Sequence, residues 1–149
     1  MNNTRLYLDN CCFNRPYDDQ SPLRVRLETE VKLDIQNRIR EGEFELVWSY
    51  ILTFENAQNP HEERRGEIRL WSGLAKAEIL ETPQILEKMR DLESKGLKSL
   101  DALHLSCAIA GKCAYFITVD KGILNKQDRI QGIMVINPID FLELPEVAK

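Results

Sequence analysis

The chain has 149 residues, 43% of them hydrophobic and 30% charged, with only seven glycines and six prolines; this excludes a low-complexity or collagen-like chain and fits a single domain, residues 1–149, with a sizeable core. We find neither an apolar run long enough to span a bilayer nor a signal-peptide pattern after Met1, and we therefore expect a cytoplasmic protein without membrane contact. The net charge of −4 argues against binding of nucleic acid over the whole surface, although a local basic groove stays open, and an acidic total is also typical of chains that gather carboxylates around a cation.

The first part of the chain predicts a strand, a loop and a long helix. Residues 5–9 form a short apolar strand that ends in an acid, and residues 10–20 form a polar loop. Ser21 followed by Pro22 is a typical helix start, and Gly42 is a typical helix end. Apolar residues recur at every fourth position between them, which predicts a buried stripe along the helix: Leu23, Leu27, Val31, Ile35 and Ile39.

Strands and helices alternate in the remainder of the chain. Further strands are predicted over residues 44–49, 114–119 and 133–136. Helices are predicted over residues 51–56, 60–77, 82–96, 99–110 and 121–126, and after residue 138. Residues 77–80 fit either the end of a helix or a strand. Because the strands are continuous apolar runs, which is typical of parallel strands covered on both faces, we predict an α/β fold: a three-layer α/β/α sandwich with a mostly parallel central sheet.

Four acids stand where a parallel sheet binds ligands, beyond the carboxyl ends of its strands. Asp9 and Asp120 each end a predicted strand. Asp101 lies in the first turn of the helix that leads into the strand over 114–119, and Glu55 follows the second strand. Taken singly, each acid has an ordinary explanation as a turn residue, a helix cap, a helix-dipole contact or a solvated side chain. Taken together, four clustered carboxylates repel one another, which favours a cation between them, and oxygen ligands suit Mg²⁺ or Mn²⁺.

Four stretches of the chain, in the right order, resemble the PIN-domain nucleases: Asp9–Pro16, Phe54-Glu55, Leu100–His104 and Phe116–Asp120. The adjacent cysteines Cys11 and Cys12 depart from the commonest wording of the first motif. The resemblance implies a parallel α/β/α sandwich and Mg²⁺- or Mn²⁺-dependent cleavage of RNA. It assigns catalytic and metal-binding roles to four acids, which are Asp9, Glu55, Asp101 and Asp120. Many members of the family are toxins of bacterial toxin–antitoxin pairs, so the resemblance also implies a cognate antitoxin protein as a partner, and a homodimer.

The implied mechanism is metal-assisted hydrolysis of RNA phosphodiester bonds, in which carboxylates position one or two cations that activate a water and stabilise the charge on the scissile phosphate. Asn10 and Thr118 are candidates to hydrogen-bond the acids or a metal-bound water. Asn14 and Arg15, beside aromatic residues, are candidates to hold a phosphate and stack a base of single-stranded RNA. The alternative for this segment is an ordinary capped turn.

Two further features have structural rather than catalytic interpretations. His104 lies on a helix that is apolar nearly all round, so a buried structural histidine is favoured over a catalytic one. Arg64, Arg65 and Arg69 alternate with glutamates, which is typical of a solvated helix face rather than an RNA-binding track. A structural zinc site is not expected, because the four cysteines form no Cys-x-x-Cys pair.

Two other functions stay open at this point. The chain could be a PIN-like module that binds nucleic acid or protein without catalysis, although the presence of all four acids argues against this. It could also be a phosphoacceptor receiver domain, because Lys121 follows Asp120. A receiver, however, needs an acid pair at its first strand and has no use for an acid at Asp101.

Overall fold

Five parallel strands form one sheet with the order β3-β2-β1-β4-β5 in this computed structural model, which describes residues 3–148 and leaves Met1, Asn2 and Lys149 outside the described range. Leu6 of the central strand is paired with Leu46 on one side and Tyr115 on the other. The parallel α/β prediction is therefore confirmed. The strands are β1 (Thr4–Leu8), β2 (Phe44–Ser49), β3 (Ala77–Ile79), β4 (Tyr115–Ile117) and β5 (Met134–Ile136).

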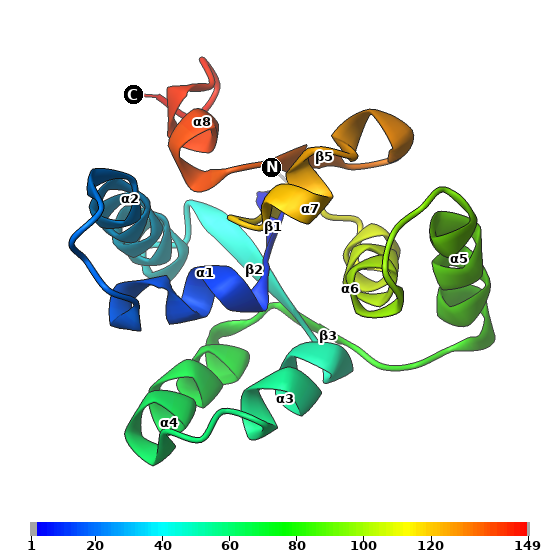
Figure 1. Cartoon of the computed structure of the whole chain (residues 1–149), viewed down its shortest axis with the longest axis horizontal. Helices are drawn as coiled ribbons and strands as arrows, with labels where there is room; N and C mark the ends of the chain where they lie inside the picture. Colours follow the sequence, from blue (N-terminus) through cyan, green and yellow to red (C-terminus); the bar gives the residue numbers. More distant parts are fainter. Residues whose placement is uncertain (1–2, 149) are drawn as a thin grey trace.

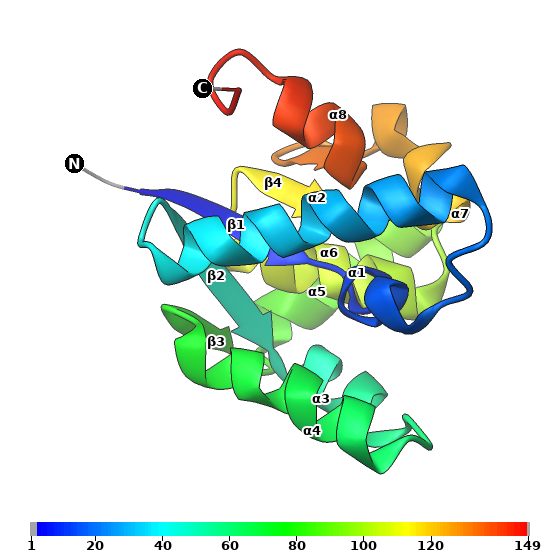
Figure 2. The same ribbon diagram turned by 90° about the vertical axis from the view of Figure 1, so that its left-hand side faces the viewer.

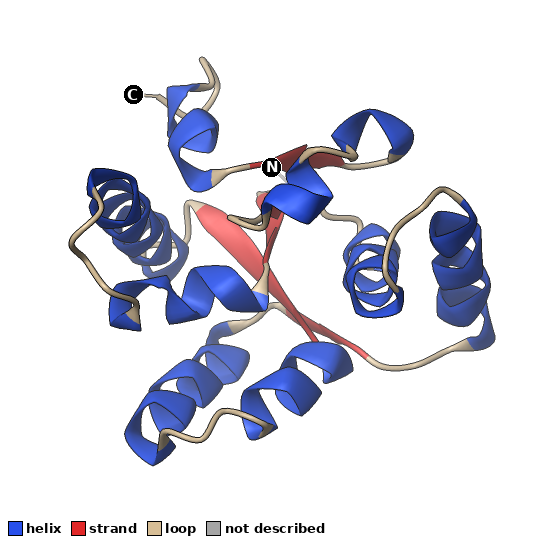
Figure 3. Cartoon of the chain, viewed as in Figure 1, coloured by secondary structure: helices blue, strands red, loops and turns tan. Residues whose placement is uncertain are grey.

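Helices cover both faces of the sheet and complete the three layers (Figures 1 and 3). Helices α1 and α2 lie on one side and α5 and α6 on the other, and Figure 2 shows α2 in front of the sheet with α6 behind it. The helices are α1 (Asn10–Asn14), α2 (Leu23–Arg40), α3 (Tyr50–Ala57), α4 (Glu62–Leu70), α5 (Pro83–Ser94), α6 (Ser99–Ala110), α7 (Lys121–Leu124) and α8 (Pro138–Glu143). Within residues 3–148, no helix has both the length and the apolar character needed to cross a membrane.

The core lies where the two central strands meet the covering helices. Tyr7 of β1 is fully buried and stacks on Phe116 of β4, with ring centroids 5.3 Å apart. Phe13 of α1 packs edge-on against Trp48 of β2. Helix α6 is buried nearly all round, as its apolar sequence predicted, and this burial fixes the helix that carries Asp101 against the sheet.

The segment predicted as a polar loop over residues 10–20 is instead largely helical. Asp9 caps α1 by accepting the backbone N–H of Asn10, and a short 3₁₀ helix follows over Arg15–Tyr17. The segment is helical because two of its apolar side chains, Cys12 and Phe13, are buried in the core, and tertiary packing of an apolar face stabilises a short helix. All four cysteines are free thiols.

Helix α2 begins one residue later than predicted, and two of the five residues in its expected apolar stripe, Ile35 and Ile39, are buried. Pro22 is the N-cap residue, and the hydroxyl of Ser21 donates to Asp19 instead of capping the helix. Ile35 is fully buried, whereas Leu23 and Leu27 are 61% and 47% exposed. The first half of α2 packs its polar face on α1 and the 3₁₀ helix, which leaves these leucines at the surface.

The helix predicted over residues 60–77 ends earlier, at Leu70, and is followed by a 3₁₀ turn over Trp71–Leu74. The ambiguous segment after it is the edge strand β3, in which Ala77 pairs with Val47. A three-residue edge strand leaves too short a pattern for its type to be predicted from sequence, because pairing with β2 and not local preference decides it.

Candidate functional site

The carboxyl ends of β1 and β4 form a topological switch point, where a parallel α/β sheet opens a crevice for ligands. These strands are neighbours, but the chain leaves β1 towards β2 and leaves β4 towards β5, on opposite sides. Asp9 directly follows β1, and Asp120 precedes α7 just after β4. Asp101, in the first turn of α6, and Glu55, in α3, are on helices that flank the same crevice.

Asp9 is the deepest of the four acids, with only 7% of its surface exposed. Its Oδ1 accepts the N–H of Asn10 at 2.8 Å, and its Oδ2 accepts the hydroxyl of Thr118 at 2.7 Å and the thiol of Cys11 at 3.4 Å. Burial raises the pKa of Asp9, and the hydrogen bond from Thr118 opposes this shift. The carboxylate is therefore held in one orientation at an energetic cost that a nearby cation would relieve.

Asp101 and Asp120 are closer to solvent than Asp9. Asp101 is half-buried, and its pKa is raised first by burial and then by the negative charges of Asp120 and Asp9. Asp120 is exposed and caps α7 by accepting the N–H of Gly122 at 2.7 Å. Both the capping and the charged-cluster interpretations of Asp120 thus describe the structure. Asp101 is repelled by the negative charges of Asp120 and Asp9, and a divalent cation would neutralise this repulsion.

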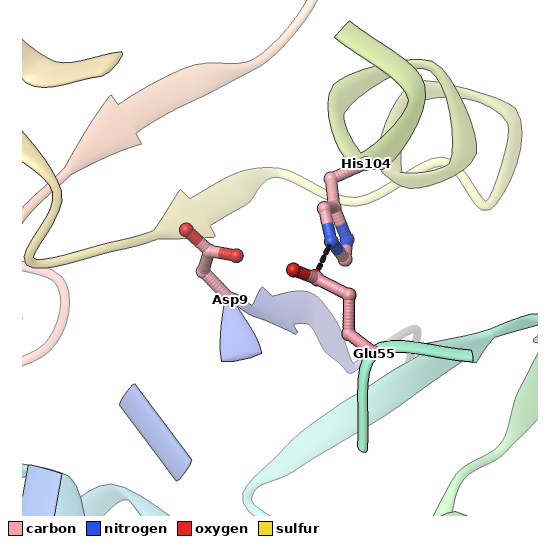
Figure 4. A group of neighbouring side chains, drawn as sticks. All are labelled: Asp9, Glu55 and His104. Carbon is pink, nitrogen blue, oxygen red and sulfur yellow. Dashed lines mark hydrogen bonds and ion pairs between the residues drawn. The ribbon is translucent and has the colours of Figure 1, made fainter. Parts of the chain in front are cut away.

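Glu55 points from α3 towards Asp9, and His104 approaches it from α6 (Figure 4). One ligand atom of each of these three residues lies within 4.8 Å of the others. His104 is buried, as predicted, with 2% exposure. Its Nε2 nevertheless contacts the carboxylate of Glu55, so the imidazole belongs to the acidic cluster. The oxygen donors of Asp9 and Glu55, together with the like-charge repulsion at Asp101, fit Mg²⁺ or Mn²⁺.

Asn10 and Asn14 line a depression of about 270 Å³ that Glu55 also borders. The side-chain oxygen of Asn10 is buried there without a hydrogen-bond partner. Asn14 donates to the carbonyl of Asn10 and accepts from Asn59. Two larger depressions, of about 690 and 640 Å³, have linings that include none of the candidate residues. The small depression, by contrast, adjoins one of the four acids, Glu55.

Thr118 and Arg15 both have partners within the protein. Thr118 is fully buried between the Asp9 carboxylate and the N–H of Asp120, so the hydrogen bond to an acid that was expected of it is present. Arg15 forms ion pairs with Glu28 and with Asp18, each at 2.9 Å, and Glu28 is only 1% exposed. The guanidinium of Arg15 is thus committed to a buried carboxylate, and the expected phosphate contact finds no support in this geometry.

Arg64 was expected to be solvated, but it borders the depression beside Glu55. Its guanidinium carbon lies 4.7 Å from the centroid of the Tyr17 ring, and its Nε is buried without a partner. The alternating charges of α4 could not indicate this position, because Tyr17 comes from a segment far away in the sequence. A basic side chain that stacks on Tyr17 and shares a depression with Glu55 is therefore a feature that only the structure reveals.

Comparisons with known proteins agree with this architecture. A family model described as PIN domain matches residues 25–129. No curated protein matches the chain significantly in sequence. Among solved structures, the chain resembles FitAcB from Neisseria gonorrhoeae with a TM-score of 0.58 and 14% identity, over 90% of this chain and 98% of that one.

Two further solved structures show the same likeness. VapBC2 from Rickettsia felis, bound to a DNA fragment from their promoter, gives a TM-score of 0.56 with 14% identity, over 90% of this chain and 98% of that one. PAE2754 from Pyrobaculum aerophilum gives 0.54 with 15% identity, over 99% of this chain and 100% of that one. At these identities the likenesses establish the shared fold alone.

Proposed function

The chain belongs to the PIN domain family, whose model spans well over half of its residues, and from this premise we propose that it is a metal-dependent endoribonuclease that hydrolyses RNA phosphodiester bonds. The observation that carries the proposal is the meeting of Asp9 and Glu55 at the switch-point crevice, with the charges of Asp101 and Asp120 acting on the same site. A non-catalytic PIN-like binding module is the alternative, and it has no use for acids held together at this cost.

The four acids have different proposed roles, which depend on how deeply each is buried. Asp9, the deepest of them, and Glu55 would hold a cation, and Asp101 and Asp120, which lie closer to solvent than Asp9, would add further carboxylate ligands. A bound Mg²⁺ or Mn²⁺ would activate water and stabilise the negative charge on the scissile phosphate. Thr118 keeps the Oδ2 of Asp9 in place, so the deepest ligand does not turn away.

We expect single-stranded RNA to be cleaved in the presence of Mg²⁺ or Mn²⁺ and to stay intact in excess chelator. The cation should also stabilise the fold, because it binds the native state: about 2.7 kcal/mol at a concentration of 100 Kd. For a chain of this size that is a rise in melting temperature of about 5–10 °C. A gel assay and a thermal melt measure the two effects. Cleavage undiminished by chelator would contradict the metal-dependent mechanism, and a cation-induced shift without cleavage would favour the binding module.

For the substrate contacts we propose the depression beside Glu55. Asn10 and Asn14 offer amide groups that can hydrogen-bond a base or a ribose, and Arg64, stacked on Tyr17, offers a guanidinium to a phosphate. The unpartnered buried atoms of Asn10 and Arg64 support this proposal, since buried polar groups ordinarily have a partner.

Arg64→Ala should weaken binding of single-stranded RNA by about tenfold, because a hydrogen bond to a charged group is lost. The slope of log affinity against log salt should fall by about 0.7, the value for one phosphate contact on a single strand. Fluorescence anisotropy across a salt series measures both quantities. Arg69→Ala is the matched control, since Arg69 is an exposed arginine of the same helix that borders a different depression. Equal effects of the two substitutions would contradict a specific role for Arg64.

Two protein partners belong to the same proposal: a cognate antitoxin and a second copy of the chain, as the family resemblance implies. Exposed leucines give such partners an apolar surface to cover, among them Leu23 on α2 and Leu70 at the end of α4, which are 61% and 71% exposed. The proposed location is the cytoplasm, where an RNA substrate is found.

A further inference from the structure

A line of buried hydrogen bonds runs behind the acidic cluster and ends on Glu55. The Oγ of Ser49 and the Oη of Tyr7 lie 2.6 Å apart, and the same Oη lies 2.6 Å from the Nδ1 of His104. The Nε2 of His104 then contacts the carboxylate of Glu55. Ser49 and Tyr7 are fully buried and His104 is 2% exposed, so these three groups satisfy one another rather than bond to solvent.

One assignment of the protons along this line gives every atom a complementary partner. An ionised carboxylate only accepts, so the Nε2 of His104 must carry a proton towards Glu55. At the other end, the Oγ of Ser49 already accepts the N–H of Leu52 at 3.2 Å, which leaves its own proton free for the Oη of Tyr7. The Oη of Tyr7, which can accept that proton, can in turn donate its own proton to the Nδ1 of His104.

The line also ties together the elements that carry the acids. Tyr7 is on β1, two residues before Asp9, and His104 is on α6, three residues after Asp101. Ser49 is the N-cap of α3, the helix that carries Glu55. The hydrogen bonds therefore start at the first turn of α3, cross β1 and α6, and return to the last turns of α3.

From this geometry we propose that His104 is a positioning residue: its Nε2 donates a proton to the Glu55 carboxylate while its Nδ1 accepts from Tyr7, and the ring thereby holds Glu55 towards Asp9. The role of Glu55 in catalysis rests on the proposed function, whereas the proton position does not. A histidine whose second nitrogen is fixed by a hydrogen bond presents its first nitrogen in one tautomer and orientation.

The proton position can be read directly, without any activity. The chain has two histidines, His104 and the exposed His61, so a protein labelled with ¹⁵N-histidine gives two imidazole patterns in a long-range ¹H–¹⁵N spectrum. At mildly alkaline pH we expect His104 to show a proton on Nε2 and none on Nδ1, with His61 as the internal reference for a solvated ring. A proton on Nδ1 would overturn the proposal.

Addition of Mg²⁺ to the same sample separates positioning from direct metal binding. We expect the proton to remain on Nε2, because the nitrogen donates to Glu55 and does not ligate the cation. Loss of that proton on addition of Mg²⁺ would make His104 a ligand and overturn the positioning role.

Two amide side chains that differ by one methylene group test the same role in the RNA cleavage assay. His104→Gln can place its amide N–H where Nε2 stood and should stay within a few-fold of the parent in kcat. His104→Asn reaches only the Nδ1 position and should lose on the order of 10- to 100-fold in kcat or metal affinity, with little change in KM for RNA. Equal losses in the two variants would overturn the proposal.

Tyr7→Phe keeps the ring and should lower kcat by up to about tenfold, since it acts on Glu55 only through His104. Tyr115→Phe is its matched control: Tyr115 lies on the neighbouring strand β4, and its hydroxyl donates to Glu146, away from the acids. It should retain the parental kcat, and an equal loss there would overturn the specific role of Tyr7. If the parent itself does not cleave RNA, the proposed function fails, while the spectrum of His104 still decides the tautomer.

Discussion

Asp101→Asn should lower RNA cleavage on the order of 10²- to 10³-fold, the loss typical of removing one group that stabilises a transition state electrostatically. Unlike Asp9 and Asp120, Asp101 does not cap a helix through its carboxylate, so the amide removes charge with little structural cost. Steady-state cleavage of a fluorescent RNA in Mn²⁺ measures the loss. The matched control is Asp128→Asn, which removes an exposed aspartate that borders a depression lined by none of the four acids and should leave the rate unaltered.

The same substitution should not weaken the fold when chelator is present. The pKa of Asp101 is raised above its ordinary value of 3.8, so the neutral acid contributes stability that is present below pH 3.8 and is lost as the pH rises through the raised pKa. At neutral pH that stability is already gone in the parent, and an amide removes both the partly buried charge and its repulsion by Asp120 and Asp9. The melting temperature of Asp101→Asn in chelator should equal or exceed that of the parent.

The melting experiment also tests the assignment of the site. The parent should gain stability on addition of Mn²⁺, and Asp101→Asn should lose most of this gain because one ligand charge is missing. A variant that melts well below the parent in chelator would instead show that Asp101 supports the fold, and would remove it from the proposed metal site.

Arg15→Ala should lower the free energy of unfolding by about 3 kcal/mol, because it leaves the carboxylate of Glu28 buried beside only one remaining arginine. Glu28 is 1% exposed, and its other partner, Arg24, approaches at 3.3 Å with a side chain that is 57% exposed. Urea denaturation measures the change, which should appear as a lower midpoint with an unaltered slope.

Two further variants show whether the buried charge is the cause. Arg24→Ala removes the exposed partner and should cost less than about 1 kcal/mol. The double variant Arg15→Met, Glu28→Leu removes both charges and should recover most of the stability, since an apolar pair of similar volume replaces a buried ion pair. A large fall in RNA affinity in Arg15→Ala at unchanged stability would restore the phosphate contact that the sequence suggested.

The sequence predicted the parallel sheet because its strands are apolar runs buried on both faces, a property that each strand carries in its own residues. Helix α6 was predicted over residues 99–110 for the same reason, and the structure has it over Ser99–Ala110. Local patterns failed where a partner decided the outcome: β3 is a strand only because it pairs with β2, and α1 is a helix because Phe13 and Cys12 find a core to enter.

The candidate site divides in the same way. The positions of Asp9, Asp101, Asp120 and Glu55 after strands and at helix starts are properties of the sequence, since chain order and strand direction bring such residues to one edge of a parallel sheet. The partners of each side chain are not, because they come from segments distant in the chain. Only the tertiary structure decided that Arg15 neutralises Glu28, that Arg64 stacks on Tyr17 beside the acids, and that His104 connects Tyr7 to Glu55. The order of the strands and helices determines where a charged side chain lies, whereas tertiary packing determines which side chain becomes its partner.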